Sequence, residues 1–157
     1  MEQATAAPVR SAAEFVKRFE STWASPSAQG LAALDHPDVV LVQPSMRTMR
    51  GRAEVERGWG ELFAALPDLR GEVLGWSGED DLVYIELRLR ATIARRPFEW
   101  TLVDRIRLED GLVRERISYF DPTPLFLESL KSPAKLPRLI RLMLPAKSGH
   151  GQTRGAA

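Results

Sequence analysis

Cysteine is absent from this chain of 157 residues, histidine occurs only twice, and neither sign of charge is in excess. Without cysteine the chain can form no disulfide, no thiolate metal site and no cysteine nucleophile. His36 and His150 stand far apart in the sequence, which leaves too few ligands for a histidine-based metal centre. We therefore predict no metal and no other cofactor. Lys and Arg number 22 against 21 Asp and Glu, a balance that disfavours nucleic acid as a partner.

Long hydrophobic runs are also missing. No stretch approaches the roughly 20 apolar residues of a membrane span, and the beginning, MEQATAAPVRSAAEF, lacks the apolar segment of a signal peptide. We therefore expect a cytoplasmic protein. Hydrophobic residues make up 44% of the chain, enough for the core of one domain at this length. The predicted organisation is a flexible N-terminus over 1–10, a folded domain over 11–130, a basic amphipathic extension over 131–147 and a disordered tail over 148–157.

Three early segments show the spacing of amphipathic helices. In the first, Phe15, Phe19 and Trp23 recur at helical intervals, and Ser11 precedes them as the predicted N-cap. The third ends at Pro67, which cannot continue a helix. We predict helices over 11–25, 31–35 and 52–66.

From Gly71 onward, apolar residues alternate with polar ones, which is typical of strands with one buried face. The sequence predicts strands over 39–43, 72–77, 82–93, 98–108 and 112–120, followed by a short helix over 125–130. Helices followed by a meander of strands predict an α+β fold. We expect a cone-shaped domain, with three N-terminal helices packed on a curved, mainly antiparallel sheet, and a C-terminal helical extension.

Asp104 breaks the apolar pattern of its strand, because the alternation places it in line with Phe98, Trp100, Leu102 and Ile106. A carboxylate facing apolar surroundings is the most informative residue of the chain. Desolvation would raise its pKa and favour a protonated donor or a general base, whereas a nearby cation would lower the pKa again.

The partner of Asp104 depends on the turn EDG at 109–111. A three-residue loop places Arg116 opposite Asp104, with Ser118 also on the inner face, whereas a two-residue loop brings Ile117 and Tyr119 inward instead. If Arg116 lies inside, it is either a catalytic partner of Asp104 or half of a structural ion pair.

The order of these elements, the segment VDRIRLEDGLV (103–113) and the closing ISYFDP (117–122) resemble the SnoaL-like family of the nuclear-transport-factor-two-like superfamily. The resemblance covers about residues 11–130. It implies a pocket between the helices and the curved sheet, as in polyketide cyclases, ketosteroid isomerase and limonene epoxide hydrolase. It also implies a homodimer that packs the outer sheet faces together, with a role for Tyr84, Arg88, Arg90 and Arg105.

Within this resemblance, Asp104 is similar to the strand aspartate that cyclases and the isomerase place in the pocket, which the isomerase keeps protonated as an oxyanion donor. Gln43 stands where the isomerase has its general-base aspartate, and Phe19 where it has a tyrosine. The epoxide hydrolase's arginine and two aspartates fall at Ile85, Leu87 and Ser118.

Two functions follow from these observations. The first is a cofactor-independent isomerase, cyclase or hydro-lyase that acts on a hydrophobic small molecule, with Asp104 and Arg116 as catalytic residues. The second is a non-catalytic ligand-binding domain of the same fold in which Asp104 and Arg116 form a structural pair. The predicted ligand-binding residues are Trp23, Gln43, Trp59, Trp100, Ser118 and Phe120.

The extension over 131–147 carries five basic residues and no acidic ones. A basic amphipathic helix can dock on an anionic membrane, so peripheral membrane contact is a further hypothesis. Packing across the pocket mouth or at a subunit seam is the interpretation that base rates favour, because apolar helix faces usually serve packing.

Overall fold

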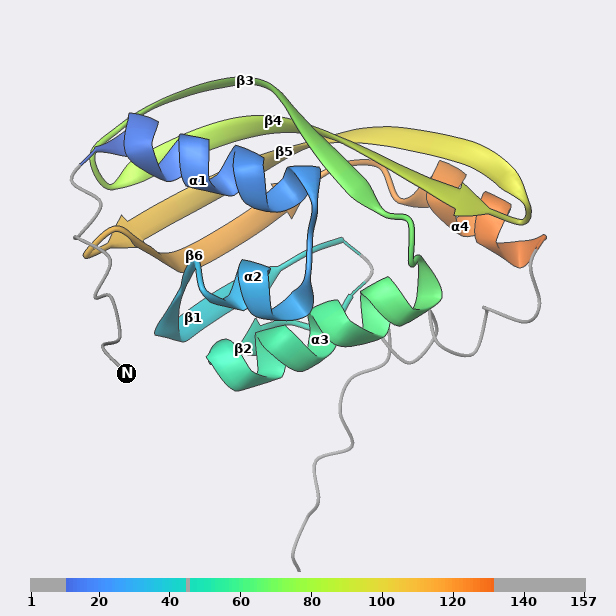
Figure 1. The fold of residues 1–157 in the computed structure, drawn as a ribbon, viewed down its shortest axis with the longest axis horizontal. Coiled ribbons are helices and arrows are strands. Elements are labelled where there is room, and N and C mark those ends of the chain that lie inside the picture. The colour runs from blue at the N-terminus through green and yellow to red at the C-terminus, as the bar shows by residue number, and fades with distance from the viewer. Residues whose placement is uncertain (1–10, 45, 132–157) are drawn as a thin grey trace, which may run out of the picture.

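The computed structural model describes residues 11–44 and 46–131. The predictions for 1–10, for 132–147 of the basic extension and for the tail over 148–157 lie outside these residues. None of the helices in the described residues is both long and apolar enough to cross a membrane. The elements, shown in Figure 1, are α1 (Ala12–Ala24), α2 (Ala28–Ala32), β1 (Asp35–Val42), β2 (Met49–Arg50), α3 (Arg52–Ala65), β3 (Arg70–Glu79), β4 (Leu82–Ile93), β5 (Arg96–Glu109), β6 (Leu112–Tyr119) and α4 (Thr123–Leu130).

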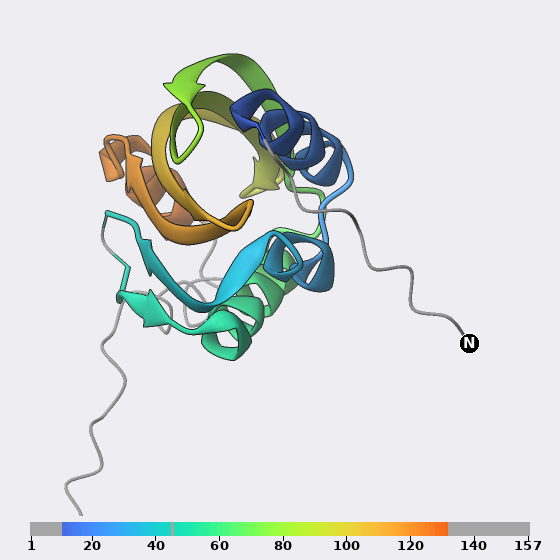
Figure 2. The ribbon, with the colours of Figure 1, turned by 90° about the vertical axis from the view of Figure 1, so that its left-hand side faces the viewer.

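The strands form one curved sheet in the order β2-β1-β6-β5-β4-β3. All neighbouring strands are antiparallel except β1 and β6, which run parallel. Figure 2 shows the sheet curling around, with α1, α2 and α3 along the side that it leaves open. The predicted α+β class and the curved, mainly antiparallel sheet are therefore confirmed.

Helix α1 begins where its capping signal predicts. The Ser11 hydroxyl accepts a hydrogen bond from the Glu14 amide at 3.3 Å, and the helix buries Phe15, Phe19 and Trp23. It packs closely on β3 because Gly71 has no side chain there. A Cβ atom on Gly71 would lie 2.9 Å from the Trp23 ring.

The short second helix lies earlier than predicted. Its N-cap is Ser27, whose hydroxyl accepts from the Gly30 amide at 2.9 Å, so the helix covers 28–32 instead of 31–35. Strand β1 consequently begins at Asp35, four positions before the predicted start at Val39. The two-residue strand β2 pairs with β1 and is an element that the sequence analysis missed.

Strand β4 follows the predicted alternation throughout. Its inner face is buried and consists of Val83, Ile85, Leu87, Leu89, Ala91 and Ile93. Together with the apolar faces of α1 and α3, these side chains form the hydrophobic core on the concave side of the sheet.

The hairpin between β5 and β6 has a two-residue turn, with Asp110 and Gly111 both at positive φ (52° and 73°), so Glu109 pairs with Leu112. Of the two loop lengths considered, the structure therefore has the two-residue one. The register then shifts by one residue, because Leu108 pairs with Val113 while Arg107 pairs with Glu115. Arg114 is the extra residue of this β-bulge. The bulge reverses the parity of the rest of β6, so Arg116 and Ser118 face inward after all.

The outer face of the sheet carries an apolar row. Val103 pairs with Tyr119, and the two side chains are 39% and 53% exposed. Charged pairs lie farther along the same face, including Arg90 with Glu99 at 3.0 Å and Arg105 with Glu115 at 2.9 Å.

Candidate functional site

The polar centre of the molecule is a buried cluster on β5 and β6. Asp104 is fully buried and accepts hydrogen bonds from Arg116 at 2.6 Å and from the Ser118 hydroxyl at 2.5 Å. Ser118 pairs directly with Asp104 across the strands, whereas Arg116 pairs with Ile106 and reaches Asp104 diagonally. The structure therefore brings the three predicted polar residues together. The pairing of β6 with β5 is shifted by two positions from the one that a three-residue loop would give.

Aromatic rings surround the guanidinium of Arg116. Its central carbon lies 5.2 Å from the ring centroid of Phe19, 5.6 Å from that of Trp23 and 5.5 Å from that of Trp59. Trp23 and Trp59 also meet edge to face, with centroids 5.6 Å apart. These rings stabilise the cation and fix its plane, since arginine is attracted to aromatic faces at this distance.

A cavity of about 50 Å³ lies beside this cage, between the helices and the sheet. We call it the central cavity. Its wall is mostly apolar, and it includes Arg116 and five of the six predicted ligand-binding residues. The lining residues are Trp23, Gln43, Met46, Trp59, Leu62, Leu89, Trp100, Leu102, Arg116, Phe120 and Leu125.

Among the described residues that line the central cavity, Asp104 and Ser118 are absent. They lie behind Arg116. Arg116 is thus the charged group that faces the cavity, and Asp104 holds it there. The Asp104 carboxylate fixes Arg116 from behind and is itself held by the Ser118 hydroxyl. An arginine fixed in this way can donate to a ligand oxygen without first having to be ordered.

Within the described residues, Nε1 of Trp23 is a buried donor without a hydrogen-bond partner, and Trp23 is part of the central cavity wall. Buried polar groups in native proteins are almost always satisfied, so a donor left open beside a cavity indicates a place for an acceptor. The cavity therefore combines a mostly apolar wall with a need for a hydrogen-bond acceptor.

A second buried carboxylate, Asp35 at the start of β1, was missed by the sequence analysis. Burial raises the pKa of Asp35 from 3.8 to about 7, and the charges of Arg116 and Arg52 partly oppose this rise. Asp35 stands at the end of the helix predicted over 31–35, where no alternation marks a residue as inward. The capping residue Ser27 was the signal that could have moved the helix and revealed the strand position.

Comparison with known proteins identifies the family to which this architecture belongs. Residues 16–116 match a family described as the SnoaL-like domain. No match was found among curated proteins.

Solved structures with the same fold include several proteins of low sequence identity. A putative SnoaL-like polyketide cyclase from Jannaschia sp. has a TM-score of 0.66 at 17% identity, covering 85% of this chain and 99% of its own. A hypothetical protein with a ketosteroid isomerase-like fold from Catenulispora acidiphila, solved with trimethylamine, has a TM-score of 0.67 at 19% identity, covering 74% of this chain and 92% of its own. A putative polyketide cyclase from Streptomyces antibioticus reaches 0.63 at 22% identity, covering 74% of this chain and 96% of its own.

Proposed function

This chain belongs to the SnoaL-like domain family, and on that premise we propose that it binds a hydrophobic small molecule bearing a carbonyl or hydroxyl oxygen in the central cavity. The observation that carries the proposal is the unpartnered donor of Trp23 beside the positive charge of Arg116 in a mostly apolar wall. The ligand's oxygen accepts from Nε1 of Trp23 and from a terminal N–H group of Arg116, while its apolar body packs against the surrounding aromatic rings.

Ligand entry requires the wall of the central cavity to move. The cavity holds about 50 Å³, whereas sites for organic ligands typically measure roughly 300–1,000 Å³. Met46, Phe120 and Leu125 are only partly buried parts of the wall and lie outside the sheet ladder. We propose that they move aside, since a methionine side chain in particular adapts its shape readily.

The chemistry that this arrangement supports is acid–base catalysis of the isomerase, cyclase or dehydratase type. Arg116 would stabilise the negative charge that develops on a carbonyl oxygen when a base takes a proton from the neighbouring carbon. Asp104 holds Arg116 in position, and its carboxylate would be the base that accepts this proton once Arg116 turns aside. The alternative function is ligand binding without turnover, with the same two residues as a structural pair.

Tryptophan fluorescence tests the binding proposal. Hydroxylated anthraquinones serve as probes, because they combine fused apolar rings with carbonyl oxygens. We expect them to quench the protein's emission, and Trp23→Phe to weaken their affinity roughly fivefold, since a neutral hydrogen bond contributes about 1 kcal/mol. The exposed Trp76 provides the control variant Trp76→Phe, which should leave the affinity unchanged. Equal losses in the two variants, or no saturable quenching, would exclude the central cavity as the site.

Asp104→Asn separates catalysis from binding alone. If the protein is an enzyme, the variant binds the substrate with unchanged affinity and loses turnover. If Asp104 is only structural, the variant loses folding stability and there is no activity to lose. Thermal unfolding, measured beside ligand titration and product formation, distinguishes the two outcomes.

A further inference from the structure

Arg116 stands between two buried carboxylates in the sheet. Strand β6 lies between β1 and β5, which carry Asp35 and Asp104 respectively. Asp104 bonds directly to Arg116. Asp35 is 7% exposed, and among the residues that the structure describes neither its Oδ2 atom nor Nε of Arg116 has a hydrogen-bond partner. One of these atoms is an acceptor and the other is a donor. A group that both donates and accepts would satisfy the two at once.

A small cavity of about 10 Å³ is lined by both Asp35 and Arg116. A volume on the order of 10–15 Å³ accommodates one water molecule, provided that polar partners are present. The remainder of the wall is apolar and is formed by Phe19, Leu31, Leu34, Leu41, Trp59 and Val113. The cavity therefore suits a single water molecule and is too small for an organic ligand.

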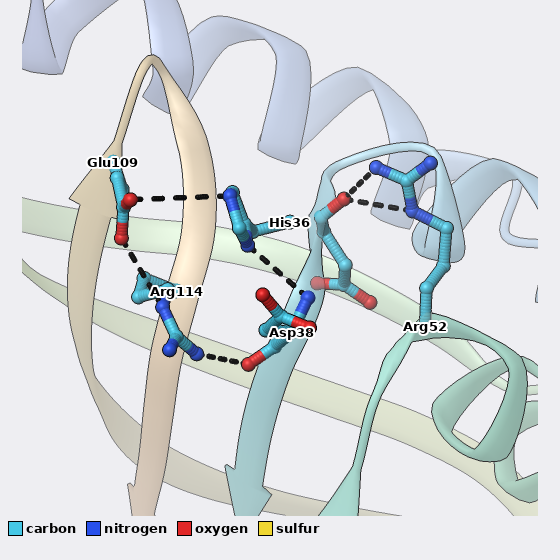
Figure 3. A network of polar contacts seen from close by, with 6 residues as sticks. His36, Asp38, Arg52, Glu109 and Arg114 are labelled. Atoms are coloured by element: carbon cyan, nitrogen blue, oxygen red, sulfur yellow. Dashed lines mark hydrogen bonds and ion pairs between the residues drawn. The ribbon is translucent and has the colours of Figure 1, made fainter.

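The backbone around Asp35 is fixed on both sides, as Figure 3 shows for its neighbours. From α3, the Nε atom of Arg52 donates to the Asp35 carbonyl oxygen at 2.9 Å. Arg114 donates to the carbonyl oxygen of Asp38, and Nδ1 of His36 accepts from the Asp38 amide at 3.1 Å. These contacts hold the start of β1 against α3 and β6, so the Asp35 carboxylate keeps its place beside the small cavity.

We propose that one water molecule in this small cavity joins Oδ2 of Asp35 to Nε of Arg116, and that Asp35 acts through it as a positioning residue for Arg116. The row Asp35, Arg116, Asp104 then carries one net negative charge when Asp35 is ionised and none when Asp35 is protonated. If Arg116 contacts the ligand, as the proposed function requires, ionisation of Asp35 weakens its hold on an electron-rich oxygen. The water site itself does not depend on that function.

The surroundings of Asp35 support a change of charge near neutral pH. Burial raises the pKa of Asp35 to about 7, against the opposing charges of Arg116 on β6 and Arg52 on α3. From α1 and α2 the cavity receives only apolar side chains, and Asp104 on β5 lies beyond Arg116. Within the described residues, these are the charged groups that face Asp35.

A high-resolution crystal structure of the full chain tests the water site directly. We expect density for one water molecule within hydrogen-bond distance of Asp35 Oδ2 and Arg116 Nε. An empty cavity, or an Asp35 side chain turned to solvent, would overturn the proposal. Neither result depends on ligand binding. The water can therefore be missing while the central cavity still binds anthraquinones, and it can be present in a protein that binds none.

A pH titration of intrinsic tryptophan emission tests the coupling, because Trp59 lines the small cavity and also packs on the guanidinium of Arg116. We expect a transition with its midpoint near pH 7, the pKa of Asp35. Asp35→Asn should abolish the transition, and the exposed Asp38→Asn should leave it in place. A transition that survives in Asp35→Asn, or that is absent from the unmodified protein, refutes the coupling.

Discussion

Replacing Asp35 by asparagine should change how the free energy of unfolding depends on pH. In the unfolded chain Asp35 loses its proton around pH 3.8, whereas burial raises its pKa in the folded protein to about 7. Between these values the folded state holds a proton that the unfolded state has released. The contribution of Asp35 to stability therefore falls as pH rises through this window, and is constant above about pH 7.

The size of the effect follows from the two pKa values. At about 1.36 kcal/mol per pKa unit, the difference between 3.8 and about 7 corresponds to about 4 kcal/mol. Asparagine cannot ionise, so the stability of Asp35→Asn relative to the unmodified protein should increase by about this amount across the window. With a urea dependence of roughly 2 kcal/mol per molar, the relative unfolding midpoint moves by about 2 M.

Urea unfolding at a series of pH values measures this difference. Other carboxylates also titrate in the window, so the decisive quantity is the stability of the variant minus that of the unmodified protein at each pH. Asp38→Asn, three residues along and exposed, is the control and should give a flat difference. The reasoning is refuted if the Asp35→Asn difference is flat too, or if it falls as pH rises.

Three further predictions concern packing, charge and assembly. Gly71→Ala should destabilise the fold by about 1–3 kcal/mol in chemical denaturation, because the new methyl group meets the buried indole of α1. Gly75→Ala is the control and should not, because a Cβ atom there would meet no described residue within 4 Å. Arg116→Met should cost about 3–5 kcal/mol in thermal unfolding, because it leaves a buried carboxylate unpaired, and a loss below about 1 kcal/mol would contradict this pairing. If the protein dimerises through its outer sheet face, Val103→Asp should make it monomeric in light scattering, whereas Leu127→Asp on α4, at a more exposed residue, should not.

The fold could be predicted from the sequence because its signals are local and strong. Strand β4 is bounded as predicted, since its alternation runs without interruption from Leu82 to Ile93. The capping serine of α1 also marks a boundary that the structure keeps. Where such signals are short, as in 28–35, the predicted helix was misplaced, because five residues contain too little periodicity to fix a start.

The site was harder to predict because it depends on contacts between strands. The inward direction of Asp104 follows from alternation alone, and the structure buries this residue completely. The position of Arg116 depends on a turn and a bulge together, and neither of the two loop lengths considered gives the observed pairing. The Ser27 cap could have placed Asp35 in a strand, but its burial comes from the parallel pairing of β1 with β6, which joins residues far apart in the chain and leaves no local signal.

The extra residue Arg114 sets which side chains of β6 beyond it face the interior of the protein. Removing that one residue would turn over every position beyond it, so that Arg116 and Ser118 would point outward while Ile117 and Tyr119 would point inward. Loss of this one codon would thus replace the inward Arg116 and Ser118 by Ile117 and Tyr119 without any substitution, and would leave Asp104 without either of its hydrogen-bond donors.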